Sequence, residues 1–159
     1  MRWYQPHSRT KVLDCAMTKL ITLIPVLFVA LVLHATHSSA APETAAFDGT
    51  WTVILVCPRA ADGAFGYTLQ FDAGVKAGVL HGQLGTPGKP GSLALDGTIE
   101  PDGTSKLAAK GLTGDPDYTT GRVREATPYA YDVSAHFKGS NGTGTRIGGR
   151  YCNFSFQRR

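Results

Sequence analysis

Residues Gly49–Cys57 read Gly-Thr-Trp-Thr-Val-Ile-Leu-Val-Cys, which places Trp51, Val53, Leu55 and Cys57 on one face of an extended segment. Alternation with a period of two is typical of a β-strand that buries one side. The run also ends in a cysteine, Cys57, and a second cysteine, Cys152, lies near the C-terminus. This stretch therefore predicts the first strand of an all-β domain.

The final apolar run, Tyr151–Arg158, has the same character, with Cys152, Phe154 and Phe156 on one face. We predict a disulfide between Cys57 and Cys152, because an exported chain folds in an oxidising compartment. Two free thiols in buried strands are the alternative.

A disulfide between directly opposed residues of antiparallel strands fixes the register of the first and last strands. Apolar side chains then meet apolar partners, a consistency that the cysteines alone do not impose. Pairing between the two ends of a chain indicates a closed barrel, which leaves no exposed strand edge. The predicted pairs are Leu55 with Phe154, Val53 with Phe156 and Trp51 with Arg158.

Between these two strands, glycine and proline clusters mark turns and separate short alternating runs. We find no convincing helical period after residue 40. The predicted fold is all-β: an antiparallel up-and-down meander of about eight strands that closes into a small barrel, with its first and last strands paired and disulfide-linked. The intervening strands are predicted at Tyr67–Ala73, Val79–Leu84, Ser92–Ile99, Lys106–Leu112, Tyr129–Phe137 and Thr143–Ile147.

The chain begins with a segment typical of export. Residues 20–33 are apolar but short for a membrane span, Lys19 precedes them, and small residues end at Ala40. We therefore expect residues 1–40 to be a leader with a signal peptide cleaved after Ala40, although a membrane anchor is the alternative. Met17 is the expected true start.

We expect a flexible tail over residues 41–46 and a single β-barrel domain over residues 47–159. We expect an exported protein, periplasmic or secreted, without stable membrane insertion after cleavage. Of the 16 basic and 12 acidic residues, four basic and one acidic lie in residues 1–40, which leaves a net charge of +1. No basic stripe with interleaved aromatic residues is present, so we expect no nucleic-acid partner.

The segment Phe47–Trp51 contains a Gly-x-Trp sequence that resembles the opening of the calycin superfamily, which includes lipocalins and avidin-like proteins. That resemblance implies an up-and-down barrel in which the first-strand Trp51 packs beneath a basic residue near the C-terminus. Arg158 falls opposite Trp51 in the predicted register, so we expect a cation–π contact between them. The chain after residue 40 also resembles a class of small exported bacterial proteins, a likeness that implies no mechanism.

Catalytic and metal-binding patterns are weak in this sequence. His81 and His136 are the two histidines after residue 40, and neither lies in a metal-ligand or nucleophile motif. Asp132, Ser134 and His136 share the outer face of one predicted strand, where nothing orients them into a relay. We therefore predict no catalytic residue, no metal site and no cofactor, and we favour a protein that is not an enzyme. An enzyme whose site is assembled by loops is the third hypothesis.

Aromatic residues on the inner faces are the best candidates for binding a ligand. A barrel of about eight strands is either filled by its own side chains or holds one small ligand, and both alternatives stay open. Ala94, Gly97, Ala109 and Gly111 are small and favour a cavity. The candidate ligand-binding residues are Trp51, Tyr67, Phe71, Tyr129 and Tyr131.

The long connection over residues 113–128 is the second candidate site, since long loops on rigid scaffolds tend to carry function. Its candidate contact residues are Tyr118, Arg122 and Arg124. The first functional hypothesis is a binding module that takes a small apolar or amphipathic ligand, or a partner, at one barrel end. The alternative is a periplasmic inhibitor or envelope-stress protein that presents the 113–128 loop to an enzyme.

Overall fold

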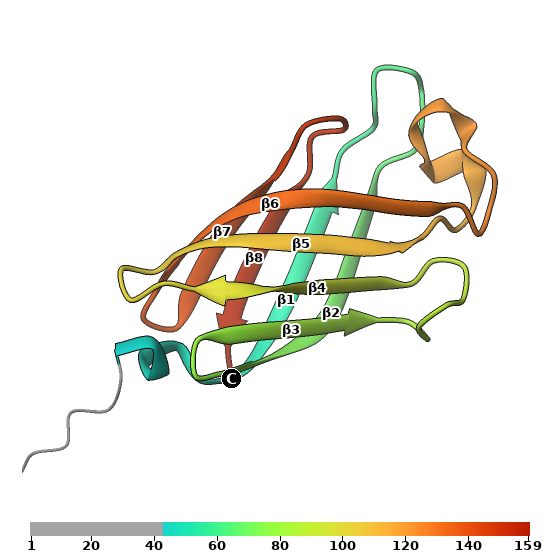
Figure 1. The fold of residues 1–159 in the computed structure, drawn as a ribbon. Coiled ribbons are helices and arrows are strands. Elements are labelled where there is room, and N and C mark those ends of the chain that lie inside the picture. The colour runs from blue at the N-terminus through green and yellow to red at the C-terminus, as the bar shows by residue number, and fades with distance from the viewer. Residues whose placement is uncertain (1–42) are drawn as a thin grey trace, which may run out of the picture. The chain divides into compact units, whose positions relative to one another are not determined.

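Eight antiparallel strands follow one another around a closed barrel in the computed structural model, which describes residues 43–159 (Figure 1). Each strand pairs with its neighbours in the chain, and β1 also pairs with β8. The predicted meander is therefore confirmed. The strands are β1 Gly49–Cys57, β2 Tyr67–Lys76, β3 Val79–Leu84, β4 Leu93–Ile99, β5 Thr104–Leu112, β6 Pro128–Lys138, β7 Asn141–Ile147 and β8 Asn153–Arg158.

The closure between β1 and β8 has the register predicted from the cysteines. Leu55 pairs with Phe154 and Val53 with Phe156, all four being buried. The predicted disulfide is present and joins Cys57, the last residue of β1, to Cys152, just before β8. The prediction started β8 at Tyr151, whereas the strand begins two residues later, at Asn153.

One end of the barrel is filled by aromatic side chains. Trp51 is fully buried, and its ring meets the Phe137 ring edge-on at 5.3 Å between centroids. Phe137 also packs on Phe156 at 4.8 Å. Opposite Phe137 in the β6–β7 register stands Gly142, where an added Cβ would lie 2.7 Å from Cδ1 of the Phe137 ring. Because Gly142 has no side chain, the Phe137 ring can pack directly against its backbone.

A short 3-10 helix, η1 (Glu43–Phe47), covers this closed end. The indole Nε1 of Trp51 donates a hydrogen bond to Phe47 O at 2.9 Å, and Arg158 Nη1 donates to Ala46 O at 2.9 Å. Residues 43–46, part of the expected flexible tail over residues 41–46, lie in this helix. Burial of the Phe47 ring beside Phe137 explains the difference, because it anchors the segment to the core.

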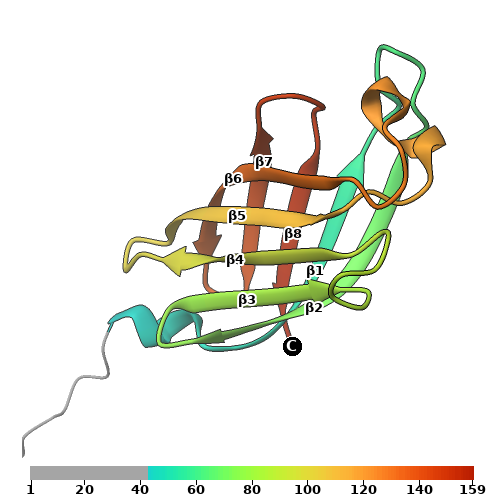
Figure 2. The same ribbon diagram turned by 45° about the vertical axis from the view of Figure 1, so that its right-hand side comes forward.

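The opposite end carries the longer connections. In both views the β1–β2 connection, the β7–β8 hairpin and the β5–β6 connection lie away from η1 and the C-terminus (Figures 1 and 2). The β5–β6 connection contains two 3-10 turns, η2 (Pro116–Tyr118) and η3 (Thr120–Arg122). These connections surround the mouth of the cavity described below.

The predicted leader, its cleavage site after Ala40 and the start at Met17 lie outside the described residues. Within residues 43–159 the structure contains no helix long and apolar enough to cross a membrane.

Candidate functional site

The open end of the barrel contains a cavity of about 1000 Å³. One wall is apolar and is contributed by leucines from four different strands. Leu55, Leu69 and Leu93 point inward because each occupies a core-facing position of its strand's alternation. Leu112 is the last residue of β5 and lines the cavity where that strand meets the 113–128 loop. These leucines are Leu55 on β1, Leu69 on β2, Leu93 on β4 and Leu112 on β5.

The wall that β6 and β7 contribute is polar. Tyr129 and Tyr131 are two residues apart on β6, and their rings stack with centroids 5.9 Å apart and planes 13° from parallel. Tyr129 donates a hydrogen bond from its hydroxyl to Ser92 O at 3.0 Å. Gly111, opposite Tyr129 on β5, makes this contact feasible, because a Cβ there would lie 1.9 Å from Ser92 O.

Three tyrosines of the cavity lining, Tyr67, Tyr129 and Tyr131, hold their protons more tightly than an exposed tyrosine does. Burial raises the pKa of Tyr129 to about 12 and raises that of Tyr131 further. Burial also raises the pKa of Tyr67, an effect that the positive charges of Arg150 and Arg146 oppose. All three side chains are therefore neutral near pH 7 and present phenol groups, not phenolates, to the cavity.

Arg146 on β7 supplies the positive charge of this wall. Its guanidinium lies 4.1 Å from the centroid of the Tyr131 ring, within cation–π distance. The Nε atom is buried and has no hydrogen-bond partner, and no ion pair among residues 43–159 includes Arg146. Its Nη2 lies 3.0 Å from the position that a Cβ at Gly149 would take, so a side chain there would displace the guanidinium.

Arg150 plays a different part, although it also lines the cavity. Its side chain is buried and donates only to backbone carbonyls, with Nη1 bonding Tyr118 O at 2.7 Å and Nη2 bonding Phe65 O at 2.6 Å. It also bonds Pro58 O through Nε at 3.2 Å and through Nη2. Arg150 thus joins three segments at the cavity mouth and is a structural support.

The 113–128 loop is held against the β1–β2 connection. Phe65 N donates to Asp117 O at 2.9 Å, and Gly121 N donates to Asp62 Oδ2 at 2.6 Å. Tyr118 packs edge-on against Phe65 at 5.7 Å and lines the cavity. The loop is therefore part of the cavity wall.

The two predicted arginines of this loop lie outside the cavity. Arg122 pairs with Asp117 of the same loop, and both side chains are about half exposed. Arg124 is exposed and takes part through its carbonyl, which accepts from Thr113 Oγ1 at 2.6 Å and Thr127 Oγ1 at 2.7 Å. The structure thus brings Tyr118 to the cavity and leaves both arginines on the outer surface of the loop.

The five predicted ligand-binding aromatic residues separate into two groups. Tyr67, Tyr129 and Tyr131 line the cavity. Trp51 belongs to the filled end, and Phe71 is buried in mid-barrel with its ring against Gly82 of β3. Neither Trp51 nor Phe71 lines the cavity.

The small residues expected to leave open space do not do so. A Cβ at Gly97 would lie 2.7 Å from Leu107 Cδ2, and Ala109 is fully buried in the core. Neighbouring side chains and backbone occupy the space above them. The cavity comes instead from the barrel's widening into loops at one end, which alternation along a strand does not reveal.

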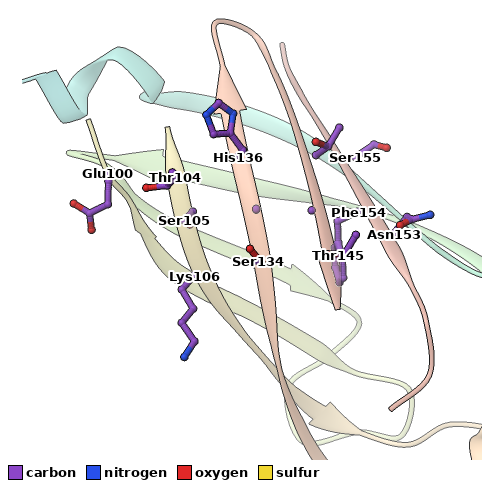
Figure 3. A pocket seen from close by; sticks show the side chains of 13 residues that line it. Glu100, Thr104, Ser105, Lys106, Ser134, His136, Thr145, Asn153, Phe154 and Ser155 are labelled. Carbon is purple, nitrogen blue, oxygen red and sulfur yellow. The ribbon is translucent and has the colours of Figure 1, made fainter. Parts of the chain in front are cut away.

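A second concavity, of about 830 Å³, lies on the outer face of β5–β8 (Figure 3). Ser134 and His136 project from β6, and Lys106 from β5, with exposed side chains. Asp132 of the same outward row pairs with Lys106 Nζ at 3.2 Å instead of with His136. No group of three metal-ligating side chains occurs within residues 43–159.

Three arginines line the cavity, and sequence reasoning identified none of them: Arg59, Arg146 and Arg150. Gly142, Gly144 and Arg146 share the inward face of β7, so the strand alternation does place Arg146 inside the barrel. Strand alternation alone would have predicted an inward Arg146, but arginines usually face solvent, and so the residue was not considered. Arg150 follows two glycines in a hairpin, and no pattern marks its contacts with segments 85 and 92 residues distant.

Comparison with known proteins gives no functional assignment. No family model, no curated protein and no solved structure matches this chain.

Proposed function

We propose that the protein is an exported binding barrel that takes a small amphipathic molecule into the cavity at its open end. The observation that carries this proposal is the two-sided lining, with leucines on one wall and Tyr129, Tyr131 and Arg146 on the other. The volume of about 1000 Å³ lies at the upper end of small-molecule sites, which span roughly 300–1000 Å³. An amphipathic ligand would satisfy both walls.

Binding, not catalysis, is what the lining supports. Among the described residues, no histidine, cysteine or glutamate lines the cavity. The two lining aspartates already accept backbone hydrogen bonds, Asp62 from Gly121 N and Asp115 from Asp117 N. Tyrosines with raised pKa values and an arginine are poor general bases near pH 7. No acid, base and nucleophile of the lining are held together by a hydrogen bond, as a catalytic set would be.

Export is part of the proposal and rests on two observations. The Cys57–Cys152 disulfide is compatible with an oxidising compartment, where such bonds persist. The apolar run over residues 20–33, followed by small residues up to Ala40, has the pattern of a signal peptide. A calycin-like relationship is supported by the Arg158 guanidinium, which lies 5.9 Å from the Trp51 ring centroid.

A neutral fluorescent probe, N-phenyl-1-naphthylamine, tests the cavity without depending on charge. We expect saturable enhancement of its fluorescence by the wild-type protein. The variant Leu69→Trp adds bulk inside the cavity and should abolish the signal. Its control is Gln70→Trp, the same substitution one residue along β2 on the exposed outer face. Absence of a signal from the wild-type protein, or an equal signal from both variants, would contradict the proposal.

A second candidate function is docking of a protein partner at the cavity mouth, as in the inhibitor hypothesis. Two observations favour it. Phe65, Tyr118, Val123 and Tyr151 are exposed apolar side chains of the segments around the mouth. Arg122, with φ of 51°, adopts a left-handed backbone that costs free energy for a non-glycine residue. Capture of one stoichiometric periplasmic protein by the wild type, and its loss in Val123→Asp, would support this function; capture unaffected by Val123→Asp would exclude it.

A further inference from the structure

Arg146 is a charged side chain inside the barrel whose charge no residue of the described chain balances. Its Nε is buried without a hydrogen-bond partner, and it enters no ion pair with residues 43–159. The Arg146 side chain as a whole is half-buried. Charged groups removed from water are ordinarily paired, because the lost hydration is costly unless a partner replaces it. A guanidinium left in this condition in the ligand-free protein is suited to receive an anion.

We propose that the natural ligand is a monoanion whose carboxylate binds the guanidinium of Arg146 on the β6–β7 wall. This inference rests on the proposed function, since it specifies the ligand of the same cavity.

The neighbouring charges support an anion over a cation. Arg150 adds a second positive charge to the cavity lining, and its bonds go to neutral carbonyls that do not cancel that charge. The negative groups of the lining, Asp62 and Asp115, accept bonds from backbone N–H groups of the rim. None of these aspartates pairs with Arg146. The cavity is therefore electropositive at its polar wall, which attracts anions and repels cations.

The geometry around Arg146 favours a planar carboxylate. Stacking on Tyr131 at 4.1 Å holds the guanidinium beside the aromatic wall, and a guanidinium binds a carboxylate through two parallel hydrogen bonds. One unpaired guanidinium balances one negative charge, whereas a phosphate would bring a second. Arg150 does not supply a second cation contact, because its guanidinium nitrogens are occupied by the Pro58, Phe65 and Tyr118 carbonyls. Arg59, the third arginine of the lining, donates from Nη1 to Gly63 O at 3.2 Å.

The other wall specifies the rest of the ligand. Leu55, Leu69, Leu93 and Leu112 offer no hydrogen-bonding side-chain group, so the body that contacts them should be apolar. The ligand class is thus an amphipathic carboxylic acid with an apolar body of a size that the cavity admits.

A matched pair of probes tests this inference: dansylaminoundecanoic acid and its methyl ester, which differ only in the charge of the head group. We expect the wild-type protein to bind the acid about 10- to 100-fold more tightly than the ester, as expected of a charge-assisted hydrogen-bonded pair. The variant Arg146→Gln should lose this preference while binding the ester within about twofold of the wild type. Arg146→Met provides a second variant with the same expectation.

Arg159→Gln is the control, because it removes an equal charge at an exposed position that pairs with Asp72 outside the cavity. It should keep the full preference for the acid. Equal wild-type affinity for acid and ester overturns the inference, as does a preference that survives Arg146→Gln or is lost in Arg159→Gln. If the ester and N-phenyl-1-naphthylamine still bind in that case, the proposed function stands and only the anionic ligand fails. If neither neutral probe binds, the cavity proposal itself fails.

Discussion

The guanidinium of Arg146 lies 4.1 Å from the centroid of the Tyr131 ring. Arg146 pairs in the β6–β7 ladder with Val133, which is fully buried, and Tyr131 is the next residue of β6 on the same face. Along the barrel axis, the end that contains Trp51 and Phe137 is filled by side chains, and the end that contains Tyr131 and Arg146 holds the cavity. A stacked and unpaired arginine adds little stability to the ligand-free protein, because its desolvation opposes the cation–π attraction. Arg150, four residues further along, is held by four hydrogen bonds and contrasts with it.

The two arginines should respond differently to the same substitution. Arg150→Met leaves the carbonyls of Pro58, Phe65 and Tyr118 without their donor and should lower the free energy of unfolding by about 2–4 kcal/mol. Arg146→Met removes no hydrogen bond and should change it by less than about 1 kcal/mol. Urea denaturation measures both values. Equal losses in the two variants would mean that Arg146 is a structural residue.

Gly111 should be intolerant of a side chain. In Gly111→Ala the new Cβ would meet Ser92 O and the Tyr129 hydroxyl, so β4 and β5 must separate, at a cost of about 2–3 kcal/mol. Gly74→Ala is the control, since Gly74 also lies within a strand and has no atom within 4 Å of its Cβ position. That variant should change the unfolding free energy by less than about 0.5 kcal/mol. Thermal unfolding of the two variants checks the contrast, and similar melting temperatures would contradict it.

The buried tyrosines should make the protein sensitive to alkali. The folded state raises the pKa of Tyr129 from 10 to about 12 and also raises the pKa of Tyr67 and Tyr131. Between those pKa values the unfolded chain binds fewer protons than the folded one. The contribution of these tyrosines to the free energy of unfolding is therefore fully present below about pH 10 and is lost as the pH rises through about 12. Tyrosinate absorbance should show a late phase that urea removes and that is smaller in Tyr129→Phe. A titration identical in folded and unfolded protein would contradict this account.

The disulfide should contribute a large share of the stability. It spans 95 residues, for which the chain-entropy model gives about 4–5 kcal/mol. Cys57→Ala/Cys152→Ala should lose an amount of that order in urea denaturation. As a direct check, peptide mapping after alkylation of the unfolded, unreduced protein should find neither Cys57 nor Cys152 modified. Alkylation of both would show that the strands close without the bond.

The barrel and its closure were predictable because they depend on local alternation and on one covalent constraint. Inward positions recur every second residue, and the assumed opposition of Cys57 and Cys152 then sets Val53 against Phe156, as the structure has it. The packing of the filled end was harder to predict from the sequence. Whether Phe137 lies over Gly142 depends on pairing between β6 and β7, which the turn at Gly139–Ser140 fixes and which the alternation within each strand does not.

The candidate site was predictable only in part for a related physical reason. Tyr129 and Tyr131 were identified as inward aromatic residues, but their distance from Trp51 along the barrel axis was not. Strand stagger sets that distance, and it separates residues that share one inward face. Contacts such as Arg150 with Pro58 join loops that are remote in sequence, and loop packing has no periodic signal.

The most direct test of the cavity proposal is a titration of the ¹⁵N-labelled protein with N-phenyl-1-naphthylamine, followed by backbone amide and indole resonances. We predict shifts at Leu69, Leu93 and Tyr131 around the cavity, and an unchanged Trp51 indole resonance in the filled end. Shifts confined to the outer groove, at Ser134, Thr145 and Ser155, would contradict the proposal, and so would an unchanged spectrum at saturating probe.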